Sequence, residues 1–164
     1  MPKETKPLHG RVHIVAYQKT KNGEVKIKCT VFDNLIVNTG KDSILKQLGG
    51  CGLCCSGQSA AIGVGDSTQA AALADTDLIA MCNRTWKNIS PCCKTYIRPT
   101  VFLSVDFGYG EANYTWNEIG LADDQGCPLN DPVCGSALWA RQIDCTPLCK
   151  DCTKRAIVEW QLTL

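Results

Sequence analysis

The chain has 164 residues and a mass of 17.8 kDa, the size of one domain. Its hydrophobic fraction of 45% supplies a core, so disorder along the whole chain is excluded. Apolar stretches such as residues 60–65 are too short to cross a bilayer, and no apolar stretch follows the charged first residues, so we expect neither a membrane span nor a secretory signal. A net charge of +1 argues against a nucleic-acid binder that depends on bulk electrostatics.

The chain opens with two β-rich runs, residues 11–17 and 24–32, and residues 35–37 extend the second run. Asn22-Gly23 between the runs predicts a hairpin, since both residues of such a turn take positive φ. Apolar and polar residues alternate in the second run, which predicts one buried and one exposed face. The side chains expected on the buried face are Val25, Ile27, Cys29 and Val31.

One helix is predicted over residues 39–48, because Thr39 can cap it, apolar residues follow at helical spacing and Gly49-Gly50 ends it. Six further strands are predicted, at residues 60–64, 84–89, 96–107, 114–122, 137–143 and 156–164. No helix separates consecutive strands, so we expect an antiparallel β-sandwich or barrel of about eight strands with one short helix. This domain spans residues 1–164, with residues 1–10 as a flexible N-terminal arm.

The charges divide between two segments of the chain. Residues 1–30 carry seven basic and two acidic side chains, whereas residues 100–151 carry eight acidic and two basic ones. The two segments form either two solvated faces of one domain or complementary patches on neighbouring copies of an assembly, where opposite charges would guide register.

Twelve cysteines are far more than a cytosolic globular protein usually carries. Bound metals, a hyperthermophile's interior, or oxidising conditions reached without secretion could each explain them; a virus particle released by lysis is an example of the third. Cys51-x-x-Cys54 and Cys149-x-x-Cys152 outline a four-cysteine zinc site, but the pairs lie far apart in sequence and the only histidines, His9 and His13, lie in the first strand. A redox enzyme is disfavoured because Cys51 follows the predicted helix instead of starting one.

Disulfide bonds are the favoured explanation, because most cysteines fall in predicted loops. Counting strands places the loops with Cys92-Cys93 and with Cys127 and Cys134 at one end, and Cys82 with the loop of Cys145, Cys149 and Cys152 at the other. Bridges would form within these groups or to a neighbouring subunit, and six bridges exceed what one domain needs, since each adds about 2–4 kcal/mol. The disulfide candidates are Cys51, Cys54, Cys55, Cys82, Cys92, Cys93, Cys127, Cys134, Cys145, Cys149 and Cys152.

The order of several motifs resembles a widespread class of small structural proteins of tailed bacteriophages, found in tail, neck or fibre regions. The motifs are Asn34 to Gly40 before the helix, Ala60 to Gly65 followed by a loop of Thr, Ala and Asp, Glu118-Ile119-Gly120-Leu121, Leu138 to Arg141 and the closing Val158 to Leu164. The resemblance covers residues 30–164 and brings no catalytic residues with it. It implies a virion structural protein, a subunit of a neck or collar, tail or fibre attachment, that assembles as a disulfide-reinforced oligomer. A capsid decoration protein and a receptor- or glycan-binding fibre module are the alternatives, and a zinc-stabilised interaction domain is a weaker one.

The remaining motifs favour structure over catalysis. Gly63 and Gly65 predict close backbone approach or a bulge, because Gly-x-Gly without a third glycine does not make a dinucleotide site. Glu118 is expected to point outward or to cap, and Asp75 to cap a turn. With no Gly-x-Ser-x-Gly or His-Glu-x-x-His motif we expect no enzyme, no cofactor and no metal. The expected partners are copies of the chain and other virion proteins, with a host receptor as a further candidate, and the expected location is the virion.

Overall fold

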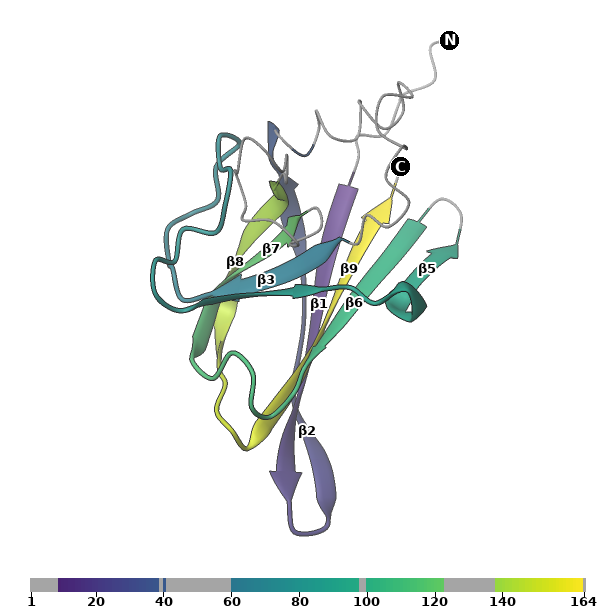
Figure 1. Ribbon diagram of the computed structural model, residues 1–164, viewed down its shortest axis with the longest axis vertical. Helices are drawn as coiled ribbons and strands as arrows, with labels where there is room; N and C mark the ends of the chain where they lie inside the picture. The colour runs from purple at the N-terminus through teal and green to yellow at the C-terminus, as the bar shows by residue number, and fades with distance from the viewer. Residues whose placement is uncertain (1–8, 39, 41–59, 98–99, 123–137, 164) are drawn as a thin grey trace.

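The computed structural model describes residues 9–38, 40, 60–97, 100–122 and 138–163, and it shows a mainly antiparallel β fold (Figure 1). The described residues contain nine strands: β1 (His9–Thr20), β2 (Gly23–Ile36), β3 (Ala61–Gly65), β4 (Arg84–Asn88), β5 (Lys94–Ile97), β6 (Thr100–Phe107), β7 (Thr115–Ala122), β8 (Leu138–Cys149) and β9 (Lys154–Thr163). They form one sheet in the order β4-β3-β7-β8-β2-β1-β9-β6-β5. The predicted class, an antiparallel sandwich or barrel, is therefore confirmed.

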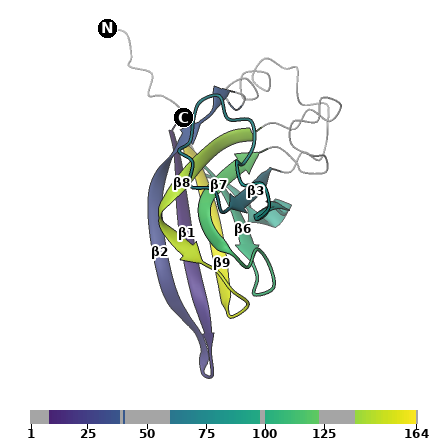
Figure 2. The same ribbon diagram turned by 90° about the vertical axis from the view of Figure 1, so that its left-hand side faces the viewer.

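The sheet folds over on itself because β2 belongs to both of its halves. Along most of its length β2 pairs with β1, while only Leu35 and Ile36 pair with β8, opposite Arg141 and Ala140. The half β2-β1-β9-β6-β5 therefore faces the half β4-β3-β7-β8, and the two are joined near one end of β2 (Figure 2). A 3-10 turn, η1 (Pro91–Cys93), connects β4 to β5, the two strands that end the sheet order.

The core lies between these two halves. Val12, Ile14 and Ala16 of β1 are fully buried, as expected for alternate residues of a strand with one face inward. Phe107 and Trp116 meet from opposite halves with ring centroids 5.1 Å apart in an edge-on arrangement.

The first hairpin is present as predicted, with Thr20 opposite Gly23. Its turn differs from the prediction in one respect, because only Gly23 has a positive φ, of 120°, and Asn22 does not. The Thr20 hydroxyl stabilises this turn, because it accepts a hydrogen bond from the Asn22 amide at 3.3 Å and donates one to the Gly23 carbonyl at 2.8 Å.

Two strand predictions were wrong in extent. One strand was predicted over residues 96–107, but residues 96–97 belong to β5 and residues 100–107 to the antiparallel β6, with Ile97 opposite Thr100. Pro99 is the signal in the sequence for this break. β8 continues to Cys149, beyond the predicted end at residue 143. Pro147 lies near the end of β8. A proline is tolerated there because no described strand pairs with this part of β8 on its β2 side.

Two further expectations concern the ends of described segments. The predicted helix over residues 39–48 lies almost entirely outside the described residues. β1 begins at His9, so residues 9 and 10 belong to the sheet and not to the expected N-terminal arm, whose residues 1–8 lie outside the described part.

Candidate functional site

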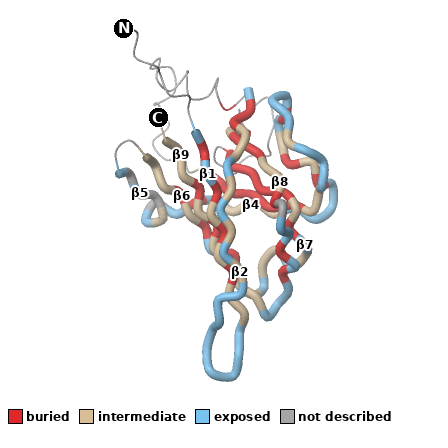
Figure 3. The backbone as a smooth tube through the Cα atoms, turned by 180° about the vertical axis from the view of Figure 1, so that it is seen from behind, coloured by how far each residue is buried: buried red, intermediate tan, exposed pale blue. Residues whose placement is uncertain are grey.

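The β1–β2 hairpin exposes the side chains that were predicted to be buried. Val25 and Val31 each retain 53% of their accessible surface, Ile27 retains 44%, and Cys29 is exposed as well. Figures 1 and 2 show the turn of the hairpin extending beyond the rest of the described chain, and Figure 3 shows that end of it as exposed. The prediction of a buried apolar face on β2 was therefore wrong.

The register of β2 against β1 explains this exposure. Opposed residues of an antiparallel pair point to the same face, so Thr30 opposite Ile14 and Phe32 opposite Val12 point inward with the buried face of β1. Cys29 and Val31 consequently point outward. The register then shifts by one residue between Ala16 and Tyr17, so the alternation that holds in sequence does not correspond to one face in space.

The outward face continues across β1 and β9. Cys29 lies opposite Val15, which lies opposite Ile157, so three half-buried or exposed apolar side chains form a row across three strands. His13 lies beside this row, and its Nε2 atom is 3.2 Å from Cys29 Sγ. We call the exposed side chains Val25, Ile27, Cys29 and Val31, together with this row, the apolar hairpin surface. It covers both faces of the hairpin: Cys29 and Val31 point outward with the row, whereas beyond the register shift Val25 lies opposite Gln18, on the side of Ala16, and Ile27 lines the side toward β8.

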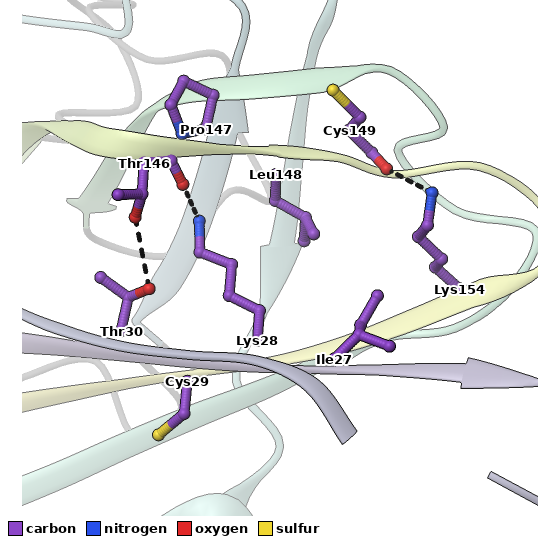
Figure 4. A pocket seen from close by; sticks show the side chains of 9 residues that line it. All are labelled: Ile27, Lys28, Cys29, Thr30, Thr146, Pro147, Leu148, Cys149 and Lys154. Atoms are coloured by element: carbon purple, nitrogen blue, oxygen red, sulfur yellow. Dashed lines mark hydrogen bonds between the residues drawn. The ribbon is translucent and has the colours of Figure 1, made fainter. Parts of the chain in front are cut away.

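An open groove of about 570 Å³ separates the β2 side of the hairpin from the end of β8 (Figure 4). Polar groups bridge it: Lys28 Nζ lies 2.6 Å from Asp144 Oδ2 and donates to the Thr146 carbonyl, and the Thr30 and Thr146 hydroxyls are 3.4 Å apart. Lys28 belongs to the basic segment of the sequence and Asp144 to the acidic one, so at this point the two segments pair within one chain.

A second set of contacts holds the hairpin to the neighbouring loop. The Tyr109 hydroxyl donates to Glu24 Oε1, and Arg155 Nη1 lies 3.5 Å from the same carboxylate oxygen. The hydrogen bond that the Tyr109 hydroxyl donates to Glu24, together with burial, raises the pKa of Tyr109, because ionisation would place two anions side by side. The ammonium of Lys19 lies 5.7 Å from the centroid of the Tyr109 ring. The hairpin is thus held close to its turn, since Glu24 lies opposite Lys19, next to the pair Thr20 and Gly23.

The opposite half of the sheet has an outer face that the chain covers itself. Residues 66–83, here called the covering loop, lie over β3 and β7, and all five residues of β3 are buried. Glu118 of β7 is completely buried and accepts hydrogen bonds from the amides of Ile79 at 3.1 Å and Ala80 at 2.7 Å. Glu118 therefore does cap backbone amides, but the prediction that it might instead point outward was wrong.

Arg141 completes a buried ionic cluster with Glu118 and Asp75. Its Nε donates to Glu118 Oε2 at 2.7 Å, its Nη1 donates to Asp75 Oδ2 at 2.8 Å, and no surface of Arg141 is exposed. The carbonyls of Gln69 and Ala70 in the covering loop accept further hydrogen bonds from the guanidinium, at 2.7 and 3.2 Å. Sequence reasoning missed this cluster; its only signal was a charged residue inside each of two apolar strands.

Three glycines let the outer face of this half pack closely, which confirms the predicted close approach at Gly63 and Gly65. A Cβ atom at Gly63 would lie 2.5 Å from the Trp86 ring, and one at Gly120 would lie 3.0 Å from it. A Cβ atom at Gly65 would lie 2.5 Å from Glu118 Oε1. Since Gly63 and Gly120 are opposed in the register, Trp86 lies across a flat strip formed by two strands.

The structure describes some of the disulfide candidates and not others. Cys82, Cys92, Cys93, Cys149 and Cys152 are free thiols, as is Cys29, and all of them except the half-buried Cys93 are exposed. Cys145 and Cys149 lie in β8 and not in the loop predicted for them. Cys51, Cys54, Cys55, Cys127 and Cys134 lie outside the described residues, so the predicted pairing stays a prediction.

No group of three or more His, Cys, Asp or Glu side chains that could hold a metal ion occurs among the described residues. In that same part of the chain, no helix has the length and apolarity needed to cross a bilayer. Glu118 and Asp75 are the paired carboxylates that could suggest acid–base chemistry. Both oxygens of Glu118 and the Oδ2 atom of Asp75 accept hydrogen bonds from Arg141 or from backbone amides.

These features define a mainly β protein whose most distinctive surface is a protruding apolar hairpin. Comparison of the chain with protein-family models, with curated proteins and with solved structures found no match.

Proposed function

We propose that the protein is a non-enzymatic structural subunit of a tailed-bacteriophage virion, in a neck or collar, tail or fibre attachment. It assembles with copies of itself and other virion proteins into an oligomer that disulfide bonds reinforce. The resemblance of its motifs to virion proteins of this class supports the particle assignment. Capsid decoration is the alternative position in the particle.

The observation that carries the assembly role is the apolar hairpin surface. A soluble monomer scatters exposed apolar side chains singly, whereas here four alternate residues of one strand are exposed along a hairpin whose turn extends past the rest of the described chain. The hairpin is held in place, because Tyr109 and Arg155 both contact Glu24 beside its turn. A rigid arm with apolar side chains suits insertion against a neighbouring subunit.

Exposed thiols support the covalent part of the proposal. Five described cysteines are both free and exposed, and Cys29 is itself part of the apolar hairpin surface. In an oxidising particle such thiols are available for bonds to neighbouring chains, with no rearrangement of the core.

Sedimentation of the full chain over a range of concentrations tests assembly, and intact mass under denaturing, non-reducing conditions tests cross-linking. We expect an oligomer in the first measurement and, after oxidation, a covalent species in the second that returns to 17.8 kDa on reduction. A chain that stays monomeric at every concentration would refute the assembly role.

Matched variants locate the interface. Ile27→Glu and Val31→Glu should weaken self-association about tenfold or more, since each places a charge in an apolar contact. Leu73→Glu is the control, because Leu73 is 46% exposed, close to the 44% of Ile27, but lies in the covering loop. All three should leave the free energy of unfolding within about 0.5 kcal/mol of the wild type, as exposed substitutions usually do. Equal weakening by Leu73→Glu would contradict an interface at the hairpin.

A further inference from the structure

Two adjacent thiols lie at the corner where the chain passes from β4 to β5. Cys92 is exposed, Cys93 is half-buried against the core, and their sulfur atoms are 3.8 Å apart. The Ser90 hydroxyl lies 3.1 Å from Cys92 Sγ, so the sulfur of the exposed Cys92 has two hydrogen-bond partners.

These surroundings favour the thiolate of Cys92 over that of Cys93. Hydrogen bonds from Ser90 and then from Cys93 lower the pKa of Cys92, because both stabilise its anion. The same contact with Cys92, together with burial and the nearby Asp106 carboxylate, raises the pKa of Cys93. Of the two thiols, the accessible one is therefore the better nucleophile.

The two thiols are poorly placed to bond to each other. Consecutive Cα atoms are about 3.8 Å apart across a trans peptide, whereas disulfide-bonded cysteines usually have Cα atoms about 4.4–6.8 Å apart. A mixed disulfide on Cys92 is therefore not readily released by Cys93, whose sulfur is also half-buried and a weak attacker. It persists until a thiol from another chain reaches it.

We propose that Cys92 is the thiol–disulfide exchange site through which the protein becomes cross-linked, with a low-molecular-weight disulfide as oxidant and a second copy of the chain as final partner. In the first step the Cys92 thiolate attacks one sulfur of the oxidant, the oxidant's S–S bond breaks, and one thiolate leaves and takes a proton from water. In the second step a cysteine thiolate of the second copy attacks the Cys92 sulfur and displaces the remaining half of the oxidant as a thiolate. Two thiols are oxidised and one disulfide is reduced to two thiols. The second step rests on the proposed function, whereas the first does not.

The first experiment treats the reduced full chain with oxidised glutathione at neutral pH and maps the modified peptides over time. Cys92 should be modified about three- to tenfold faster than Cys82 or Cys152, which are also exposed. Ser90→Ala should slow the modification of Cys92 and leave the rate at Cys82 unchanged. Cys29, whose sulfur has His13 at 3.2 Å, is the strongest competitor, and faster modification there would overturn the proposal.

The second experiment removes the glutathione and follows covalent dimers on non-reducing gels. The proposal expects dimers from the wild type and from Cys82→Ser, at least fivefold fewer from Cys92→Ser, and a normal thermal transition for all three. Equal dimer yield from Cys92→Ser would overturn the inference and leave the proposed oligomer intact. If Cys92 is modified first but no copy becomes cross-linked, both the second step and the disulfide reinforcement in the proposed function are wrong.

Discussion

Replacing Glu118 by Gln should reveal how strongly the buried ionic cluster holds the covering loop. The substitution keeps the shape of the side chain, but it removes the charge that faces Arg141 Nε at 2.7 Å and places an amide group where two backbone amides donate. Breaking one side of a buried pair costs about 3–5 kcal/mol. We expect the lower end, about 3 kcal/mol, because Asp75 still accepts a hydrogen bond from Arg141.

This loss is large compared with the whole stability of a domain, which is about 5–15 kcal/mol. For a chain of this length each kcal/mol lowers Tm by about 2–4 °C, so Glu118→Gln should lower it by about 6–12 °C. Urea unfolding monitored by tryptophan fluorescence would measure the free energy of unfolding of the variant and of the wild type. Limited proteolysis should show earlier cleavage within residues 66–83, because the carboxamide keeps only one acceptor oxygen and the loop therefore loses one of its two amide contacts with this side chain.

The control and the double variant make the test specific. Arg84→Gln removes a surface pair with Asp77, half-exposed on the arginine side, and should cost no more than about 1 kcal/mol. The Glu118→Gln/Arg141→Met double variant should lose at least about 1 kcal/mol less than the sum of its single variants, since the two side chains interact directly. A cost below about 1 kcal/mol for Glu118→Gln, or strict additivity in the double variant, would refute the view that this cluster secures the covering loop.

Two further predictions concern packing and acid stability. Gly63→Val should destabilise the fold by about 2 kcal/mol or more and shift the fluorescence of Trp86, because any Cβ atom there meets its ring at 2.5 Å; unchanged fluorescence would contradict the contact. The Lys87 ammonium, bonded to both oxygens of Glu111 at 2.6 and 2.8 Å, lowers the pKa of that carboxyl below its unfolded value. The stabilisation is therefore complete above the unfolded pKa, near 4.3, and is lost as pH falls toward the folded pKa. Urea midpoints measured from pH 6 to pH 3 should fall less steeply for Glu111→Gln than for the wild type, and parallel curves would contradict this assignment.

The positions of most strands could be predicted because alternation, turns and glycines are local signals. The direction in which β2 faces could not, since it depends on its register with β1 and on the shift between Ala16 and Tyr17. The register follows the buried face of β1, so Cys29 and Val31 point outward. Val25 and Ile27 lie beyond the shift and are exposed in the end of the hairpin that extends past the rest of the described chain. The pattern of polar and apolar residues within β2 alone does not show which side chains of the strand are buried.

The buried cluster was hidden for a related reason. Glu118 and Arg141 lie on different strands, and each looks like a solvated charge within its own segment. They meet because β7 and β8 are neighbours and because the covering loop returns to bring Asp75 and four backbone groups to the same place. Long-range pairing of this kind is visible only once the sheet order is known.

The two outer faces of the sheet therefore differ in what covers them. Over β3 and β7 the chain supplies its own cover, with Glu118, Arg141 and the glycine strip built to hold it. Over β2, β1 and β9 no described residue plays that part, and the row from Cys29 to Ile157 stays partly exposed. If apolar surface on both faces has to be removed from water, the second face needs another molecule. An assembly partner at the hairpin would cover this face as the covering loop covers the other. Val31→Glu should therefore weaken self-association without changing the free energy of unfolding, whereas Glu118→Gln should first lower the free energy of unfolding.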